Sequence, residues 1–287
     1  MKDIPVRNII AAEAGTFFNN FSIRDLHDLL AGKDMVQELH RHNFFYVLAL
    51  KKGKGTHEID FTSYDIADNA VFFLRPGQVH QLTLKAGSTG YLLSFKADFH
   101  APQDQSGHQL LRKASSMNHY QSDNDGFKRI NTPLDNIFQE YNNKQAQYGE
   151  VITANLYIFF VELIRQYNKA SAGNVNLYMQ ERLEEFLTLL ETHITSIKQA
   201  SAYADMLHLS LYQLNTITKS TLGKTCSEMI NEHIILEAKR YLRATSSQVS
   251  QIADHLGYED VSYFIRFFKK HTGSSPEVFR QQFRSVK

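Results

Sequence analysis

The sequence has almost no cysteine, no long hydrophobic run and almost no net charge, and each absence excludes a class of protein. Its 287 residues include one cysteine, so no internal disulfide can form, which is typical of a reducing compartment. The most apolar stretch, residues 156–164, is too short to span a bilayer and contains Glu162. Residues 1–15 have no apolar core of signal-peptide length. We therefore expect a cytoplasmic protein with no membrane partner.

The formal net charge of +1 does not indicate a nucleic-acid partner, but the basic residues are unevenly spread. Residues 261–287 contain one acid, Glu277, against a larger basic set: Arg266, Lys269, Lys270, Arg280, Arg284 and Lys287. A local basic face can neutralise DNA phosphates on a protein that is neutral overall. A solvated helix face is the alternative, and it is the commoner meaning of a charge run.

Residues 249–276 have the pattern of two short helices joined by a tight turn. Apolar residues recur three and four positions apart over residues 249–256, and Gly257 then supplies the left-handed residue that ends the helix. Asp260 is placed to cap the next helix. The residues that we expect to form the core of that helix are Phe264, Phe267 and Phe268. The pattern predicts a helix-turn-helix, whose second helix enters the major groove of DNA.

Residues 252–276 match a specific run, I-A-x-x-L-G-Y-x-D-x-S-Y-F-x-R-x-F-K-K-x-x-G-x-S-P, which Phe279 and Arg280 extend. This run resembles the signature of the AraC/XylS family of bacterial transcriptional regulators. The resemblance implies a DNA-binding domain with two helix-turn-helix units and a role in transcription regulation. It also implies a regulator that, on binding its effector, either binds its operator differently or recruits RNA polymerase as an activator, and it leaves activation and repression both open. No enzymatic activity and no cofactor are expected.

A less basic helix-turn-helix is predicted upstream, over residues 203–222, with Ser210 as the cap of its recognition helix. Members of the family usually have an arginine and a phenylalanine in this helix. Thr216 and Thr218 stand at those positions, so this helix is expected to contact DNA more weakly or to contact different bases. A helix over residues 227–242 is expected to be a rigid spacer between the two units.

Two recognition helices on one spacer can enter successive major grooves, about 34 Å apart. Arginine can bind guanine O6 and N7 with two hydrogen bonds, so Arg266 is expected to contact a base together with Ser262, one helical turn before it. Val261 is expected to meet a thymine methyl group, and Lys269 and Lys270 to contact phosphate. The corresponding residues of the first helix are Tyr212, Asn215, Thr216 and Lys219.

Residues 1–130 predict strands and turns. Short apolar or alternating runs, such as residues 44–50, 56–61 and 79–84, are separated by glycine-rich turns, such as residues 51–55. Many short strands at this spacing indicate a β-sandwich or barrel, here a jelly roll.

Two pieces of this half resemble the cupin family: residues 40–42, followed by Gly53, and residues 76–80. The resemblance implies a metal site of three histidines and a glutamate, but the glutamate position falls at Tyr46 or Val47. The three matching positions are His40, His42 and His80. Three imidazoles can still bind a divalent metal, but without the glutamate we expect no metal.

The alternative is a small-molecule cavity without metal. Side chains alternate along a strand, so the even-numbered residues from 40 to 48 would share one face of the barrel. The effector-binding domain of AraC-type proteins, itself cupin-like, implies the same. The expected ligand-binding residues are His40, His42, Tyr46, His57 and His80. For His57 and His80, a purely structural hydrogen-bonding role is the other interpretation.

The pattern becomes helical near residue 131, and the loop at residues 171–174 is the expected boundary. The predicted fold is a multidomain α+β protein. Its parts are a cupin-like ligand-sensing jelly roll (1–130), a helical linker (131–175) and an all-α AraC-type DNA-binding domain with two helix-turn-helix units (176–287). The helices of the linker either pair two protomers in a homodimer or cover the barrel.

The function predicted from these features is sequence-specific binding to a double-stranded DNA operator, controlled by a small-molecule effector bound in the barrel. One alternative is a metal-dependent cupin enzyme, against which the missing glutamate argues. Another is a DNA-binding protein whose barrel only dimerises.

Overall fold

The computed structural model describes residues 5–7, 9, 20–96, 99, 105–170 and 177–282. The contacts within it divide the chain into two units, Pro5–Ala172 on one side and Gly173–Lys287 with Met1–Ile4 on the other. The predicted boundary loop at residues 171–174 lies outside the described residues.

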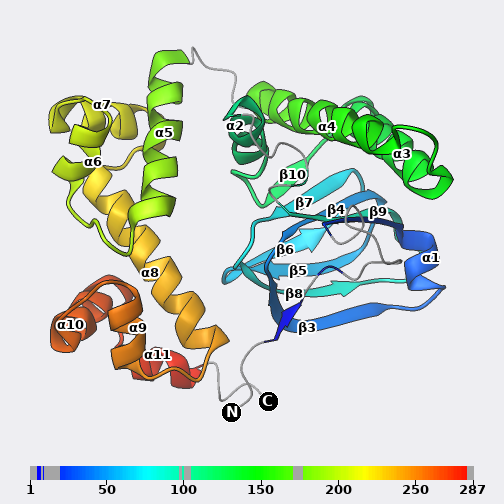
Figure 1. Ribbon diagram of the computed structural model, residues 1–287. Helices are drawn as coiled ribbons and strands as arrows, with labels where there is room; N and C mark the ends of the chain where they lie inside the picture. Colours follow the sequence, from blue (N-terminus) through cyan, green and yellow to red (C-terminus); the bar gives the residue numbers. More distant parts are fainter. Residues whose placement is uncertain are drawn as a thin grey trace. The chain divides into compact units, whose positions relative to one another are not determined.

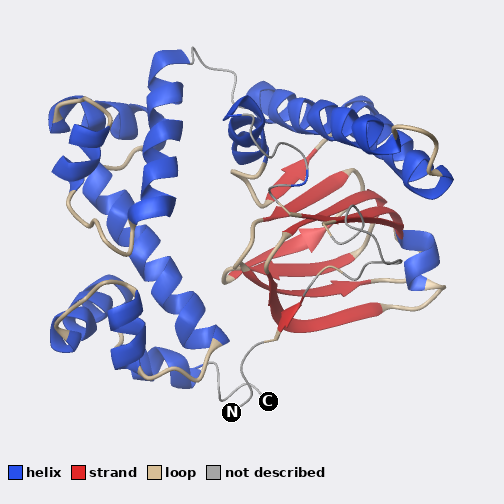
Figure 2. Ribbon diagram, viewed as in Figure 1, coloured by secondary structure: helices blue, strands red, loops and turns tan. Residues whose placement is uncertain are grey.

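The first unit contains two five-stranded sheets among its described residues (Figures 1 and 2). The first sheet has the order β1 (Val6–Arg7), β3 (Met35–His42), β8 (Val79–Leu84), β5 (Gly55–Ile59) and β6 (Thr62–Ile66). The second has the order β10 (His119–Gln121), β7 (Ala70–Leu74), β4 (Phe45–Lys52), β9 (Thr89–Phe95) and β2 (Phe21–Asp25).

Among the eight strands from β2 to β9, the first pairs with the last, the second with the second-last, and so on toward the middle. β2 pairs with β9, β3 with β8, β4 with β7, and β5 with β6, all antiparallel. Alternate pairs belong to alternate sheets. This nested pairing of eight strands over two sheets is the jelly roll, which confirms the predicted fold class.

The central strands β4 and β7 are buried on both faces, which explains their continuous apolar sequence. Tyr46 and Leu48 of β4 belong to the core between the two sheets, whereas Val47 and Ala49 belong to a second core on the outer face. The alternation of side chains along one strand therefore supplies two cores at once.

Helices α2 (Gln105–Ala114), α3 (Asn124–Asn143) and α4 (Tyr148–Ala170) build that second core over the sheet that contains β4 (Figure 1). The ring of Phe160 on α4 lies 6.0 Å from that of Phe73 and 5.9 Å from that of Phe95. The helices thus cover the barrel, as one of the two interpretations requires. Helix α3 begins before the predicted residue 131, because the Asp123 side chain accepts a hydrogen bond from the Gly126 amide at 2.6 Å. The short α1 (Leu26–Leu30) follows β2.

The second unit contains helices joined by loops, with no strand among its described residues, and it contains an internal repeat (Figure 2). A seven-residue helix is followed by a twelve-residue helix twice, first as α6 (Ala200–Met206) and α7 (Leu211–Leu222), then as α9 (Val249–His255) and α10 (Val261–Thr272). Between the two pairs runs α8 (Cys226–Ala244), which spans about 28 Å. The flanking helices are α5 (Leu177–His193) and α11 (Pro276–Gln282). None of the helices in the described part of the chain has the length and apolar character needed to cross a membrane.

Candidate functional site

Helix α10 is held by its apolar face and by both of its ends. Asp260 Oδ1 accepts a hydrogen bond from the Ser262 amide at 2.7 Å, and Gly273, with φ of 81°, ends the helix. Phe264 and Phe268 are fully buried, as predicted. Phe267 is only half-buried, because its ring lies on the helix flank beside Tyr258 at 5.7 Å. The prediction of a core position was therefore wrong for Phe267.

The opposite face of α10 is exposed and basic. Ser262, Arg266, Lys269 and Lys270 are all exposed, whereas Val261 is half-buried. The guanidinium of Arg266 lies 3.9 Å from Asp260 Oδ2, and the Arg266 side chain is 68% exposed. An exposed ion pair of that length contributes little, so the guanidinium can exchange it for a base or a phosphate.

Helix α7 has the same construction with less charge. Ser210 and Gln213 form a reciprocal capping box, and Gly223 ends the helix. Tyr212, Thr216 and Lys219 lie on its exposed face, and the Tyr212 side chain is 81% exposed.

Asn215 differs from its neighbours on α7. It is half-buried, and its Oδ1 accepts a hydrogen bond from the Cys226 amide at 3.0 Å, at the start of α8. Its side chain therefore joins the recognition helix to the spacer helix. On α10 the sequence prediction overlooked Tyr263, which is 55% exposed beside Ser262. The sequence feature that could have indicated Tyr263 is a large aromatic residue in the first turn of a recognition helix.

The second helix-turn-helix unit is fastened to the spacer helix and to the loop that follows it by hydrogen bonds. Tyr241 Oη on α8 lies 2.6 Å from His255 Nε2 on α9. The buried Arg280 on α11 donates to the Ser247 carbonyl at 2.5 Å. These contacts hold α9 against α8, and α11 against the loop between α8 and α9, on either side of α10 in the sequence.

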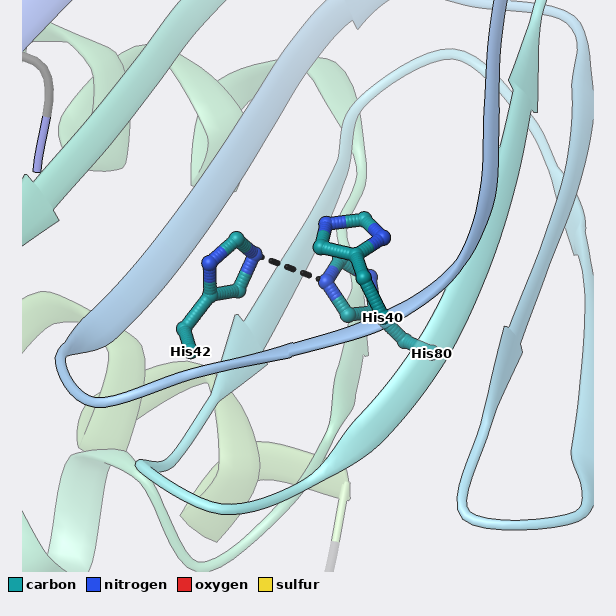
Figure 3. Close-up of side chains that lie close together, drawn as sticks. All are labelled: His40, His42 and His80. Carbon is teal, nitrogen blue, oxygen red and sulfur yellow. Dashed lines mark hydrogen bonds between the residues drawn. The ribbon is translucent and has the colours of Figure 1, made fainter. Parts of the chain in front are cut away.

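In the barrel, four histidines converge from three neighbouring strands. His40 and His42 are on β3, His80 is on β8 and His57 is on β5, and His40 is the direct register partner of His80. Figure 3 shows the imidazoles of His40, His42 and His80 grouped together. All four histidines are buried.

Tyr46 joins this cluster from the opposite sheet, because its ring stacks on that of His42 with 5.1 Å between the centroids. The even-numbered residues from 40 to 48 do not belong to one strand, as the prediction from alternation assumed, since the chain turns at residues 43–44, between β3 and β4. His42 and Tyr46 still meet because both strands point these side chains into the barrel.

Burial keeps the four imidazoles neutral. Desolvation lowers the pKa of His40 to about 4, and that of His42 and His57 to about 3. It also holds the pKa of His80 well below its ordinary value. Desolvation raises the pKa of the Tyr46 phenol, which therefore stays protonated.

A cavity of about 460 Å³ opens beside this cluster. Of the predicted ligand-binding residues, His42 and Tyr46 line it. The other lining residues are Arg7, Ile9, Ser22, Arg24, Gln37, Phe44, Leu92 and Ser94. Phe44 is one of the even-numbered residues expected on this face, but sequence reasoning overlooked the other seven, because most of them come from β1, β2 and β9, far from the histidine motifs. No local signal connects them.

Two family models match this chain. The model described as AraC-like ligand binding domain matches residues 32–119, and the model described as helix-turn-helix domain matches residues 203–282. Together they match more than half of the chain. The chain belongs to the AraC family. The first match contains the histidine cluster, and the second contains both recognition helices.

AraC-family relatives extend along most of the chain. The HTH-type transcriptional activator RhaS of Escherichia fergusonii is 25% identical over 254 residues, which cover 84% of this chain and 87% of that protein. The uncharacterized HTH-type transcriptional regulator YfiF of Bacillus subtilis is 22% identical over 257 residues, covering 87% and 80%. These relatives are transcriptional regulators, which confirms that this AraC-family chain is a regulator and not an enzyme.

Among solved structures, fatty-acid-bound ToxT from Vibrio cholerae is 17% identical, covers 93% of this chain and 96% of its own, and has a TM-score of 0.41. These values are too low for the likeness to carry an argument about an AraC-family ligand or assembly.

Proposed function

We propose that this AraC-family regulator reads a specific operator with α7 and α10, and that a small molecule in the barrel cavity controls this binding. The observation that carries the proposal is the exposed basic face of α10, mounted on a buried aromatic core and joined to a second unit of the same construction. A recognition helix needs both properties: a set position and side chains that reach the groove.

Few side chains on α10 and α7 are placed to recognise bases. Arg266 and Ser262 lie one helical turn apart on the exposed face of α10 and suit direct contact with base edges. Lys269 and Lys270 suit phosphate contacts, which add affinity without sequence information. On α7, Tyr212, Thr216 and Lys219 are in the corresponding positions.

The lining of the cavity indicates what kind of effector it takes. Arg7 and Arg24 are cationic, Ser22, Ser94 and Gln37 supply hydrogen bonds, and Phe44, Tyr46 and Leu92 supply apolar surface. Among the described residues that line it there is no carboxylate. A small polar metabolite with a carboxylate or phosphate group fits this lining best.

Two experiments test this function. Selection from random DNA with the full chain should return one enriched sequence with two half-sites about one helical turn apart. A thermal shift screen with carboxylated and phosphorylated metabolites should identify ligands that raise the melting temperature. Arg24→Gln should lose that shift. Failure to enrich any sequence would overturn operator recognition, and a screen without hits would favour a barrel that only dimerises.

The homodimer is a separate proposal. Val151 and Ile158 on α4 are 38% and 51% exposed, although both are large and apolar. A second copy of the chain would cover them. Sedimentation of the full chain should show a dimer that Ile158→Glu dissociates, and a monomeric wild-type protein would contradict it. Recruitment of RNA polymerase stays a prediction.

A further inference from the structure

The histidine cluster in the barrel is difficult to explain as packing alone. His40, His57 and His80 are fully buried and His42 is 6% exposed. Each imidazole carries two polar nitrogens, and buried polar atoms in proteins are almost always partnered. A cluster of four such rings therefore needs partners for eight nitrogens away from water.

His40 has a nitrogen with no such partner. Its Nδ1 lies 2.7 Å from the Glu38 carbonyl oxygen, which can only accept, so Nδ1 carries the ring proton. Its Nε2 must then carry the lone pair, and this atom is buried without a hydrogen-bond partner. A basic nitrogen held in this way, with its other nitrogen donating to a carbonyl, is the usual form of a metal-binding histidine.

The other two rings place their nitrogens close to this lone pair. His42 Nε2 and His80 Nε2 lie 2.8 Å apart, and the candidate ligand atoms of His40, His42 and His80 all lie within 4.8 Å of one another. Two nitrogens on one tetrahedral zinc ion lie about 3.3 Å apart. The observed separations depart from that value by about 1.5 Å at most.

The chemistry of the ligands selects the kind of ion. Where the cupin pattern has a carboxylate, this barrel has Tyr46, a buried phenol whose oxygen has no hydrogen-bond partner. Three neutral imidazoles without a carboxylate suit a borderline ion such as Zn²⁺ or Co²⁺, and they suit Mg²⁺ and Ca²⁺ poorly. A fourth position would be open to water or another ligand.

His57 has a distinct place in this cluster. Its Nε2 lies 2.9 Å from His80 Nδ1. Once His80 Nε2 bound an ion, the His80 proton would be on Nδ1 and would be donated to His57 Nε2. Partners of this kind orient a ligating imidazole and raise its basicity. His57 comes from β5, outside the two cupin-like motifs.

We propose that His40, His42 and His80 bind one Zn²⁺-class ion through their Nε2 atoms, and that His57 is the positioning residue that orients His80. The site goes beyond the proposed function, since neither operator recognition nor an effector requires it.

Metal binding to the full chain tests the site. After treatment with a chelator and dialysis, the protein should bind one equivalent of Zn²⁺ and, with Co²⁺, develop visible absorption from a four-coordinate ion. His40→Ala and His80→Ala should each lower Zn²⁺ affinity at least a hundredfold. His119→Ala is the matched control, a half-buried histidine outside the cluster, and should bind like wild type. A wild-type protein without bound metal, or unchanged binding in His40→Ala and His80→Ala, would overturn the proposal.

If the alanine variants do not fold, NMR of the wild-type protein still tests whether the three histidines bind Zn²⁺. Histidine ring nitrogens observed by NMR should show Zn²⁺ on the Nε2 atoms of three histidines and a proton on His80 Nδ1. Histidine signals that Zn²⁺ leaves unchanged would refute the site. DNA binding enters neither measurement, so a negative result leaves the proposed function untouched.

The role of His57 is tested by two variants. His57→Phe removes the acceptor and should weaken Zn²⁺ binding about 10–100-fold. His57→Gln provides an amide oxygen that can accept from His80 Nδ1, and should recover most of that loss. Equal affinity in wild type and His57→Phe would show that His57 does not orient the ligand, and so would equal losses in the two variants.

Discussion

Gly257 lies directly against the carbonyl oxygen of Thr195. A Cβ added to this glycine would meet that oxygen at 1.8 Å, and the backbone φ of Gly257 is 72°. Lys198 reinforces the contact, since its Nζ donates to the Gly257 carbonyl at 2.9 Å and to the Thr195 carbonyl at 3.2 Å. The turn of the second helix-turn-helix is therefore fastened to the loop between α5 and α6, and Gly257 is required for more than ending a helix.

Gly257→Ala should destabilise the DNA-binding unit by about 3 kcal/mol or more, because it combines a left-handed backbone with a backbone clash. Gly273→Ala is the matched control: its φ is 81°, but no atom lies within 4 Å of the added Cβ. That variant should cost only about 1–2 kcal/mol. Calorimetric unfolding of the full chain measures both. Equal losses would mean that the Thr195 contact is absent in solution.

Arg266→Ala should cost about 1–3 kcal/mol of binding free energy on the selected operator and relax base preference at one position. Lys270→Ala should instead weaken binding to all sequences alike and lower the salt dependence by about one released ion. Fluorescence anisotropy on operator and random duplexes at several salt concentrations separates the two. If Arg266→Ala weakens both duplexes equally, Arg266 contacts only phosphate.

Asn215→Ala should act on stability rather than on DNA sequence preference. The substitution removes the acceptor of the Cys226 amide hydrogen bond and should cost about 1 kcal/mol of unfolding free energy. Thr216→Ala, one residue further and exposed, should leave stability unchanged within about 0.5 kcal/mol. Urea unfolding measures these costs, and DNA selection with each variant measures preference. A changed base preference in Asn215→Ala would show that its side chain contacts DNA.

The metal-free barrel should lose stability in acid. The pKa values of His40, His42 and His57 fall to about 3–4 in the folded protein, whereas an unfolded histidine titrates near 6.5. The unfolded chain therefore binds more protons between these values, so unfolding becomes easier as the pH falls below about 6.5. Calorimetry at several pH values, with a chelator present, should show this slope. His57→Phe should lower the number of protons taken up on unfolding by about one, which makes the slope of stability against pH less steep. An unchanged slope would contradict the prediction.

The sequence by itself determined the second helix-turn-helix. The cap at Asp260, the left-handed Gly257 and the buried spacing of Phe264 and Phe268 were all predicted and are all observed. Helix caps and helix faces depend on residues within about four positions of one another, so a linear pattern contains most of the information. The histidine motifs were also local, and they indicated the right part of the barrel.

Only the tertiary structure decided what those histidines meet. The nested pairing of the jelly roll brings His80 beside His40, adds His57 from the next strand and places Tyr46 across from them. It also places Arg24 of β2 in the lining of the same cavity. These contacts join strands far apart in the chain, and their register depends on the packing of two complete sheets. A side chain such as Asn215 likewise gets its role from a neighbouring helix, which spacing along α7 alone does not indicate.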